Sequence, residues 1–282
     1  MQSTKPNLAC VGDNTVDVYV DKAVMFPGGN AVNVAVIAKR AQIETAYVGC
    51  LGQDKYGDLV LEALAAEGVD ISHCSRDPGP NGRALVRHTD GDRVFAGAAP
   101  GVRARIKLDA EVLNYLSKFA VLHTSINSDL DDKIDRLAGL PGLLSYDFSN
   151  RWTLEQRHLL GPRLYAAFFS ASELDDQECD ALLNSWAEAG VTLAVATRGA
   201  RGAVALHEGV LHHQAAMPTT VVDTLGAGDG FVAGVLSAIA ERKPLPLALE
   251  QGASFAAATC TLLGAFGHAQ PASGDDFILP TI

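Results

Sequence analysis

Short apolar runs and helix-compatible apolar spacings alternate along this chain. The apolar run at 8–11 is followed by valines that alternate with polar residues at 16–20, as in a half-exposed strand. Apolar residues then recur at helical spacing at 30–40 and 56–67, on either side of a strand pattern at 45–48. The pattern predicts that the chain opens with strands and two helices.

Beyond residue 105 the alternation becomes regular. The helix patterns lie at 109–117, 129–138, 153–160 and 175–189, and the strand patterns at 121–123, 143–147, 165–169 and 192–197. Such alternation predicts a mainly parallel sheet with helices on both faces. Short polar strands at 83–89 and 93–96, joined by an Asp-Gly-Asp turn at 90–92, predict an inserted hairpin. We therefore expect a single α/β domain over residues 1–282, with small lid strands inserted at about 14–25 and 82–103.

Composition and charge limit the classes of partner. The chain has 282 residues, 48% of them apolar, and a formal net charge of −11. The negative charge argues against nucleic acid or an anionic membrane as the main partner, because these surfaces bind concentrated basic residues. The N-terminus lacks the apolar core of a signal peptide, so we expect a cytoplasmic protein. Five scattered cysteines without a C-x-x-C pair suggest neither a disulfide framework nor a zinc site.

The segment Asp223-Thr224-Leu225-Gly226-Ala227-Gly228-Asp229 carries the most informative chemistry. Apolar residues at helical spacing follow it to residue 240, so the glycine turn is expected to open a helix. Unpaired N–H groups in the first turn of a helix, together with the helix dipole, attract negative charge such as that of a transferred phosphoryl group. Asp229 would stand beside that group, where its carboxylate accepts a proton from an attacking hydroxyl. The turn therefore indicates phosphoryl transfer.

Two other interpretations of this turn stay open on spacing alone. In the first, Asp223 supports a tight turn and Asp229 only favours the positive end of a helix. In the second, Gly228, Gly230 and Ala233 form the loose G-x-G-x-x-A pattern of a dinucleotide-binding turn. The second fits poorly, because no acidic residue ends a second strand about 20 residues later. A Walker-type loop is excluded, since Gly-Lys-Ser/Thr occurs nowhere in the chain.

Together with a second glycine loop, this turn resembles motifs of the ribokinase-like carbohydrate kinases, also called the PfkB family. Residues 223–229 are similar to the most specific motif of that family, and Gly28-Gly29-Asn30-Ala31-Val32-Asn33 is similar to its sugar-contacting loop. The resemblance spans nearly the whole chain. It implies a three-layer α/β/α fold with a mainly parallel central sheet and a small β lid. It also implies transfer of phosphate from ATP, with Mg2+, to a sugar.

The resemblance assigns roles residue by residue. It implies that Asp229 is the general base, and that the backbone of Gly226, Ala227 and Gly228 forms an anion hole. Asp223 and Thr224 would help to hold a monovalent cation such as K+. The sugar side would comprise Asp17, Gly28, Gly29, Asn30 and Asn33. On the lid, Arg93, Phe95 or Arg103 would meet the non-sugar part of the substrate.

On the nucleotide side, Thr197, Gly199 and Gly202 resemble the family's Thr-x-Gly-x-x-Gly turn, which follows the phosphates and ribose. Ser170 and Glu173 stand where the family has Asn-x-x-Glu, which orders water around the Mg2+ of MgATP. Serine is a departure there, because a hydroxyl cannot present the paired groups of an amide. Gly230, where a small side chain is usual, is a second departure. Residues 147–151 partly resemble the Asp-x-Asn-x-Arg pattern of keto-sugar-acid kinases, in which the arginine would neutralise ATP phosphates; a surface arginine is equally compatible.

Within the family, the segments at 12–19, 28–36, 68–73, 92–95 and 147–149 resemble those of fructoselysine 6-kinases. This resemblance implies phosphorylation of the 6-hydroxyl of a fructosamine such as fructoselysine. Fructokinase, ribokinase and keto-sugar-acid kinase activities stay open as alternatives. A sugar or nucleotide sensor without turnover is an alternative from another class, and an NAD-dependent dehydrogenase is disfavoured. The unpaired edges of lid strands predict a homodimer formed through the lid.

Overall fold

An eight-stranded sheet forms the centre of the protein in the computed structural model, which describes residues 5–89 and 92–280. The strand order is β14-β13-β12-β11-β10-β9-β1-β4. The strands are β1 (Asn7–Val11), β4 (Glu44–Val48), β9 (Val121–Ser125), β10 (Leu143–Asp147), β11 (Ala166–Ser170), β12 (Leu193–Thr197), β13 (Ala203–His207) and β14 (Val210–Gln214). Neighbours from β4 to β12 run parallel, and the β13–β14 hairpin adds two antiparallel strands at one edge.

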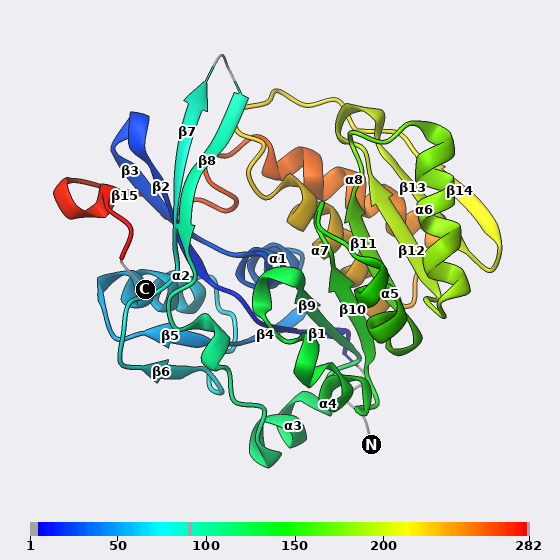
Figure 1. Ribbon diagram of the computed structural model, residues 1–282, viewed down its shortest axis with the longest axis horizontal. Coiled ribbons are helices and arrows are strands. Elements are labelled where there is room, and N and C mark those ends of the chain that lie inside the picture. Colours follow the sequence, from blue (N-terminus) through cyan, green and yellow to red (C-terminus); the bar gives the residue numbers. More distant parts are fainter. Residues whose placement is uncertain (1–4, 90–91, 281–282) are drawn as a thin grey trace.

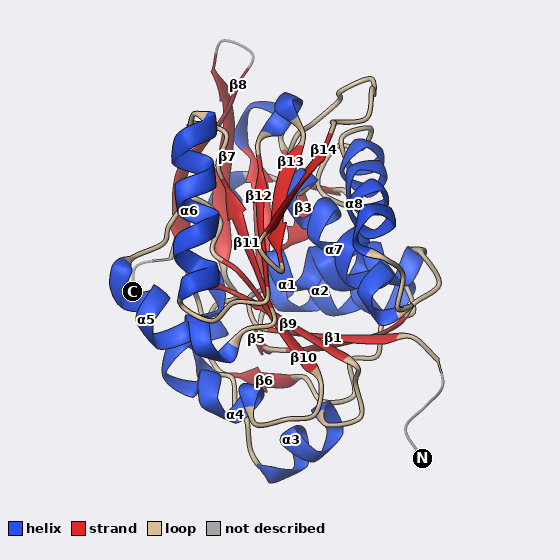
Figure 2. Ribbon diagram, turned by 90° about the vertical axis from the view of Figure 1, so that its right-hand side faces the viewer, coloured by secondary structure: helices blue, strands red, loops and turns tan. Residues whose placement is uncertain are grey.

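Helices cover both faces of this sheet, as the alternating pattern predicts (Figure 2). One layer holds α1 (Asn30–Arg40), α2 (Lys55–Ala66), α7 (Ala227–Ala240) and α8 (Leu245–Thr259), and the other holds α3 (Ala110–Leu116), α4 (Ile134–Ala138), α5 (Leu154–Leu160) and α6 (Asp176–Glu188). Each layer packs on the sheet through its own apolar core. Every residue of β1 and β9 is buried, which explains why these strands contain the apolar runs at 8–11 and 121–122. The predicted three-layer α/β/α fold is confirmed.

A second sheet stands beside the first and forms the lid (Figure 1). Its order is β15-β3-β2-β7-β8, with β2 (Thr15–Tyr19), β3 (Val24–Gly28), β7 (Arg83–Thr89), β8 (Asp92–Ala99) and β15 (Gln270–Pro271). The predicted hairpin is present as β7 and β8, while residues 90–91 of its turn lie outside the described part of the chain. The short strands β5 (Cys50–Gly52) and β6 (Ser75–Asp77) form a third, separate sheet.

The C-terminal part of the chain is fastened to the base of the lid. β15 pairs antiparallel with β3, a pairing that the sequence pattern did not predict. Further along, the carboxylate of Asp276 accepts a hydrogen bond of 2.6 Å from Tyr56 and lies 2.5 Å from Lys55 Nζ. Arg83 of β7 packs its guanidinium over the ring of Tyr56 and donates to its hydroxyl at 2.8 Å. Lid, α2 and C-terminal segment therefore share one buried polar cluster.

The predicted helix at 129–138 is wrong in its first half. Asp129 has φ 54°, which a right-handed helix cannot include, and a 3-10 turn at 131–133 precedes α4. The helix therefore begins only at Ile134. Elsewhere the predicted helices agree closely with the structure; α1, for example, spans the predicted residues 30–40. Within the described ranges, the helices are too short or too polar to cross a membrane.

Candidate active site

The predicted site residues meet at the carboxyl ends of the central strands, where α1 and α7 begin. Asn30 opens α1, Asp147 ends β10, and Asp229 lies in the first turn of α7. Ligands of open α/β sheets bind at this edge, because helix N-termini and strand ends converge there.

Gly226 sets the direction of α7. It occupies the N-cap with φ 74°, a left-handed conformation that favours glycine. A Cβ at this position would also clash with the Ala265 side chain and lie 3.1 Å from its Cα. By contrast, a Cβ on Gly228 would meet no described atom within 4 Å. The first turn of α7 therefore has space in front of it, as an anion-binding turn requires.

The departure at Gly230 has a packing reason. A Cβ there would lie 2.5 Å from Thr259 Oγ1 and 3.0 Å from the carbonyl oxygen of Phe255, both on α8. At Gly234, one turn later in α7, a Cβ would lie 2.6 Å from the carbonyl oxygen of Gln251. Glycines thus allow α7 and α8 to pack closely behind the site, and this close packing explains the residue that follows Asp229.

Two amides of α1 hold the carboxylate of Asp229. Asn30 Nδ2 donates to Asp229 Oδ1 at 2.8 Å, and Asn33 Nδ2 donates to Oδ2 at 2.6 Å. Neutral donors of this kind stabilise the ionised carboxylate, which is the form a general base needs. Because α1 and α7 are far apart in the sequence, only the fold brings these groups together. The predicted base is therefore oriented by the predicted sugar loop.

Asn30 also connects Asp229 to a second carboxylate. Its Nδ2 donates to Asp147 Oδ2 at 2.8 Å, and its Oδ1 lies 2.9 Å from Nε2 of the buried His123. Burial, followed by the negative charge of Asp229, raises the pKa of Asp147 to about 7. Burial also lowers the pKa of His123 to about 3. Sequence reasoning gave His123 no role; a histidine inside an apolar strand was the available signal.

The predicted sugar-binding side chains converge around Gly28. A Cβ on Gly28 would clash with the carboxylate of Asp17 and lie 3.7 Å from Asn33 Oδ1. Asp17 and Asn33 are only 5% and 3% exposed, and Asn33 Oδ1 is a buried acceptor with no hydrogen-bond partner among the described residues. Buried acceptors of this kind suit the hydroxyl groups of a sugar.

Asp13 stabilises the start of α1 and was not predicted as part of the site. Its Oδ2 accepts from Asn30 N at 2.8 Å, and its Oδ1 accepts from Ser125 Oγ at 2.9 Å and Ser128 Oγ at 3.1 Å. Gly29, the N-cap of α1, has φ 107°, and a Cβ there would come within 2.8 Å of Asn14 Cα. The glycine loop and the carboxylate together fix where Asn30 begins the helix.

The predicted nucleotide-side residues also lie together. Ser170 and Thr197 are register partners at the carboxyl ends of β11 and β12. Arg201, in the turn that contains Gly199 and Gly202, donates to the carbonyl oxygens of Ser172 and Leu174 at 2.7 and 2.8 Å. Glu173 is exposed between them. The described residues contain no cluster of three or more metal-binding side chains, so a Mg2+ site here would need ligands from ATP and water.

The carboxylate of Asp223 braces the phosphate turn. It accepts from the hydroxyl of Tyr19 on the lid strand β2, from Leu225 N at 3.0 Å and from Gly264 N at 3.1 Å. Thr224 is exposed, and its carbonyl oxygen lies 3.2 Å from Ala227 N. These contacts give Asp223 a structural role at the turn, and its predicted role at a monovalent cation stays a prediction.

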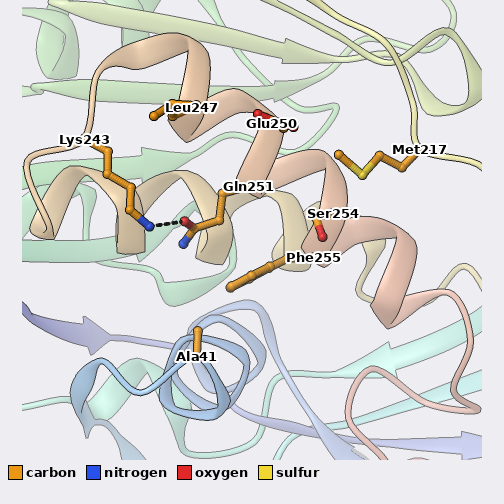
Figure 3. Close-up of a pocket in the computed structure, with 8 residues that line it drawn as sticks. All are labelled: Ala41, Met217, Lys243, Leu247, Glu250, Gln251, Ser254 and Phe255. Carbon is orange, nitrogen blue, oxygen red and sulfur yellow. Dashed lines mark hydrogen bonds between the residues drawn. The ribbon is translucent and has the colours of Figure 1, made fainter.

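The remaining predicted residues lie on the lid strand β8 and in the segments that follow β8 and β10. The side chain of Arg93 lies outside the described part of the structure, while Phe95 is 53% exposed on β8. Arg103 Nε lies 3.5 Å from Asp129 Oδ2, and Arg151 donates to Asn127 Oδ1. A cavity of about 540 Å3 between the end of α1, α8 and Met217 contains none of the predicted site residues (Figure 3).

Comparison with known proteins identifies the family of this chain. The family described as pfkB family carbohydrate kinase matches residues 4–137 and 163–270. The fructosamine kinase FrlD of Bacillus subtilis (strain 168) is 37% identical over 268 residues, covering 94% of each chain. The fructoselysine 6-kinase of Escherichia coli (strain K12) is 36% identical over 259 residues, covering 92% of this chain and 99% of that protein.

A solved structure agrees on the fold. Arabidopsis thaliana ribokinase, complexed with ribose and ATP, superposes with a TM-score of 0.80 at 19% identity, covering 93% of this chain and 95% of that one. The fold is therefore ribokinase-like, and the chain belongs to the PfkB family of carbohydrate kinases, ATP-dependent enzymes that phosphorylate sugars.

Proposed function

We propose that this enzyme transfers the γ-phosphate of MgATP to the 6-hydroxyl of a fructosamine such as fructoselysine, with Asp229 as the general base. One observation carries the assignment of the base. Both oxygens of Asp229 accept hydrogen bonds from amides of the sugar loop, and the same carboxylate lies in the first turn of α7, beside the open phosphate turn.

In the proposed reaction, the sugar hydroxyl oxygen attacks the γ-phosphorus and the bond between that phosphorus and the β,γ-bridging oxygen breaks. The hydroxyl proton goes to Asp229, ADP leaves with the bridging oxygen, and the sugar phosphate forms. Asp17 and Asn33 orient the sugar through its other hydroxyls. The N–H groups at the start of α7, including Gly228, lie where negative charge develops on the phosphoryl oxygens.

The nucleotide side follows from residues at the neighbouring strand ends. Thr197, Gly199 and Gly202 would line the phosphates and ribose of ATP, and the exposed Glu173 would hold water on the Mg2+ that ATP brings. When bound, Mg2+ would supply positive charge to the phosphate oxygens, and Glu173 would orient its water ligands. Asp223 and Thr224 help to hold K+ in this proposal. Asp223 would bind the ion while keeping its three described hydrogen bonds.

The proposed substrate class rests on the relatives and on the charge of the site. Two relatives that align over more than nine-tenths of the chain carry fructosamine and fructoselysine in their names. The described hydrogen-bond partners of the buried Asp13 are neutral, and the proposed base Asp229 is ionised, so these two carboxylates give the pocket a negative field. Such a field suits the protonated amine of a fructosamine better than the carboxylate of a keto-sugar acid.

The test measures ADP release from ATP with fructoselysine, fructose, ribose and a keto-sugar acid. We expect the highest kcat/KM with fructoselysine and loss of turnover in Asp229→Asn, with ATP binding retained. Absence of sugar-stimulated ADP release across this panel would refute the kinase assignment, and tight sugar binding without turnover would favour a sensor. Retained turnover in Asp229→Asn would refute the assignment of the base alone.

The lid supports a proposed homodimer. β8 is the edge strand of the lid sheet, and its Val94 and Phe95 are 47% and 53% exposed. Exposed apolar side chains on the edge strand of a sheet suit pairing with the same edge of a second copy. Sedimentation at micromolar concentration is expected to give a dimer, and Phe95→Lys is expected to give a monomer.

A further inference from the structure

His123 lies in the middle of β9 with no exposed surface, and the proposed mechanism does not use it. β9 and β10 pair in parallel with Ser145 directly beside His123. The imidazole Nδ1 lies 3.1 Å from Ser145 Oγ, and Nε2 lies 2.9 Å from Asn30 Oδ1. The ring therefore connects the centre of the sheet to the residue that holds Asp229.

The partners of Asn30 fix the orientation of its amide. The nitrogen must face Asp229, because the ionised carboxylate of the proposed base only accepts hydrogen bonds. The same nitrogen donates to Asp147. Asp147 is committed as an acceptor on its other oxygen too, since it accepts from Ser149 N at 2.7 Å. The amide oxygen of Asn30 is then turned toward His123.

The orientation of Asn30 in turn fixes the tautomer of His123. The imidazole is neutral, because full burial lowers its pKa to about 3. Its single N–H must be on Nε2, since the partner there is the amide oxygen of Asn30. The bare Nδ1 then accepts from the hydroxyl of Ser145. Each hydrogen bond that links Ser145 through His123 and Asn30 to Asp229 therefore has a defined donor and acceptor.

We propose that His123 is a positioning residue for phosphoryl transfer: its Nε2–H holds the Asn30 amide in the only orientation that donates to Asp229. The proposal rests on Asp229 being the base. Without this N–H the buried Oδ1 of Asn30 loses its donor, and the amide shifts toward another donor, which weakens its hydrogen bond to Oδ1 of Asp229. Asn33 then holds only the other oxygen, so the carboxylate rotates away from the attacking hydroxyl.

Three replacements of His123 separate this role from a general structural one. His123→Gln places an amide N–H near the position of Nε2, His123→Asn reaches only the position of Nδ1, and His123→Leu has similar size without a polar atom. We expect kcat per active site to fall about 10- to 100-fold in the Leu and Asn variants, as for a misplaced catalytic group. KM for ATP is expected to change less than about threefold, and the Gln variant to keep at least about a third of kcat.

Wild-type kcat in folded Leu and Asn variants would overturn the proposal, and so would a Gln variant as impaired as the Leu variant. If the variants do not fold, 15N NMR of the histidine side chains in the unmodified protein tests the same network. A neutral ring with the proton on Nε2 is expected between about pH 6 and pH 8. An Nδ1–H tautomer or an imidazolium would overturn it. Loss of all sugar-dependent turnover in the unmodified enzyme would instead refute the proposed function, and the NMR result would still stand.

Discussion

Alanine replacements at Gly226 and Gly228 are expected to separate the fold of the phosphate turn from its chemistry. In Gly226→Ala, the left-handed backbone of an alanine costs about 1–2 kcal/mol. The clash with Ala265 adds about 1–3 kcal/mol, as for an overpacked core. The free energy of unfolding is therefore expected to fall by about 2–5 kcal/mol, which lowers Tm by roughly 5–15 °C for a domain of this size.

Gly228→Ala is the matched control, because its methyl group meets no described atom. Alanine is favoured over glycine in a helix by up to about 1 kcal/mol, so Tm is expected to stay level or rise by a few degrees. The new methyl group points into the space assigned to the phosphoryl group, and kcat with sugar is expected to fall at least about tenfold.

Differential scanning fluorimetry and a coupled ADP assay measure the two effects on the same samples. A Gly226→Ala protein with wild-type Tm would contradict the strain argument. A Gly228→Ala protein with wild-type kcat would contradict the position of the anion hole.

Three further predictions follow from buried groups of the site. Between about pH 4 and pH 7 the folded state keeps the proton of Asp147, whose pKa is raised, while the unfolded state loses it. The free energy of unfolding is therefore expected to fall by about 4 kcal/mol over this range. Urea unfolding of Asp147→Asn should lack that decline, and an unchanged decline would contradict the raised pKa of Asp147. Gly28→Ala places a methyl group against Asp17. In steady-state assays, KM for sugar is therefore expected to rise at least about tenfold while KM for ATP stays unchanged. Equal rises in both KM values would place Gly28 outside the sugar pocket. Tyr19→Phe removes a hydrogen-bond donor from the buried Asp223. The free energy of unfolding, measured in urea, is expected to fall by about 1–3 kcal/mol. A fall of less than about 0.5 kcal/mol would show that the Tyr19 hydroxyl contributes little to stability.

Local patterns in the sequence were enough to predict most of the fold. The helix at 30–40 and the turn at Gly226 follow from apolar spacing and from glycine chemistry within a few residues, so their signals are contained in the segment itself. The prediction of a helix over 129–138 was wrong in its first half, because the left-handed Asp129 interrupts an otherwise helical spacing. β15 was missed because two residues leave no periodicity to detect.

The contacts that orient the base could not be predicted in this way. Asn30 is separated by 93 residues from His123, by 117 from Asp147 and by 199 from Asp229. Motif resemblance predicted Asp229 as the base and Asn30 as part of the sugar loop, and both roles stay predictions. The contacts of the Asn30 amide with two carboxylates were not predicted. Those contacts depend on which side chains the strand order places next to each other.

The lid is assembled from three separate stretches of chain, 15–28, 83–99 and 270–271, and it is anchored by Asp276. The lid therefore cannot be exchanged between relatives as one contiguous segment of the chain. A chimera that imports only the hairpin at 83–99 would pair foreign strands with a native β2 and would remove Arg83 from its partners, Tyr56 on α2 and the carbonyl oxygens of Asp275 and Asp276. Transfer of substrate preference between members of this family is expected to require all three stretches together, including the two residues of β15 near the C-terminus.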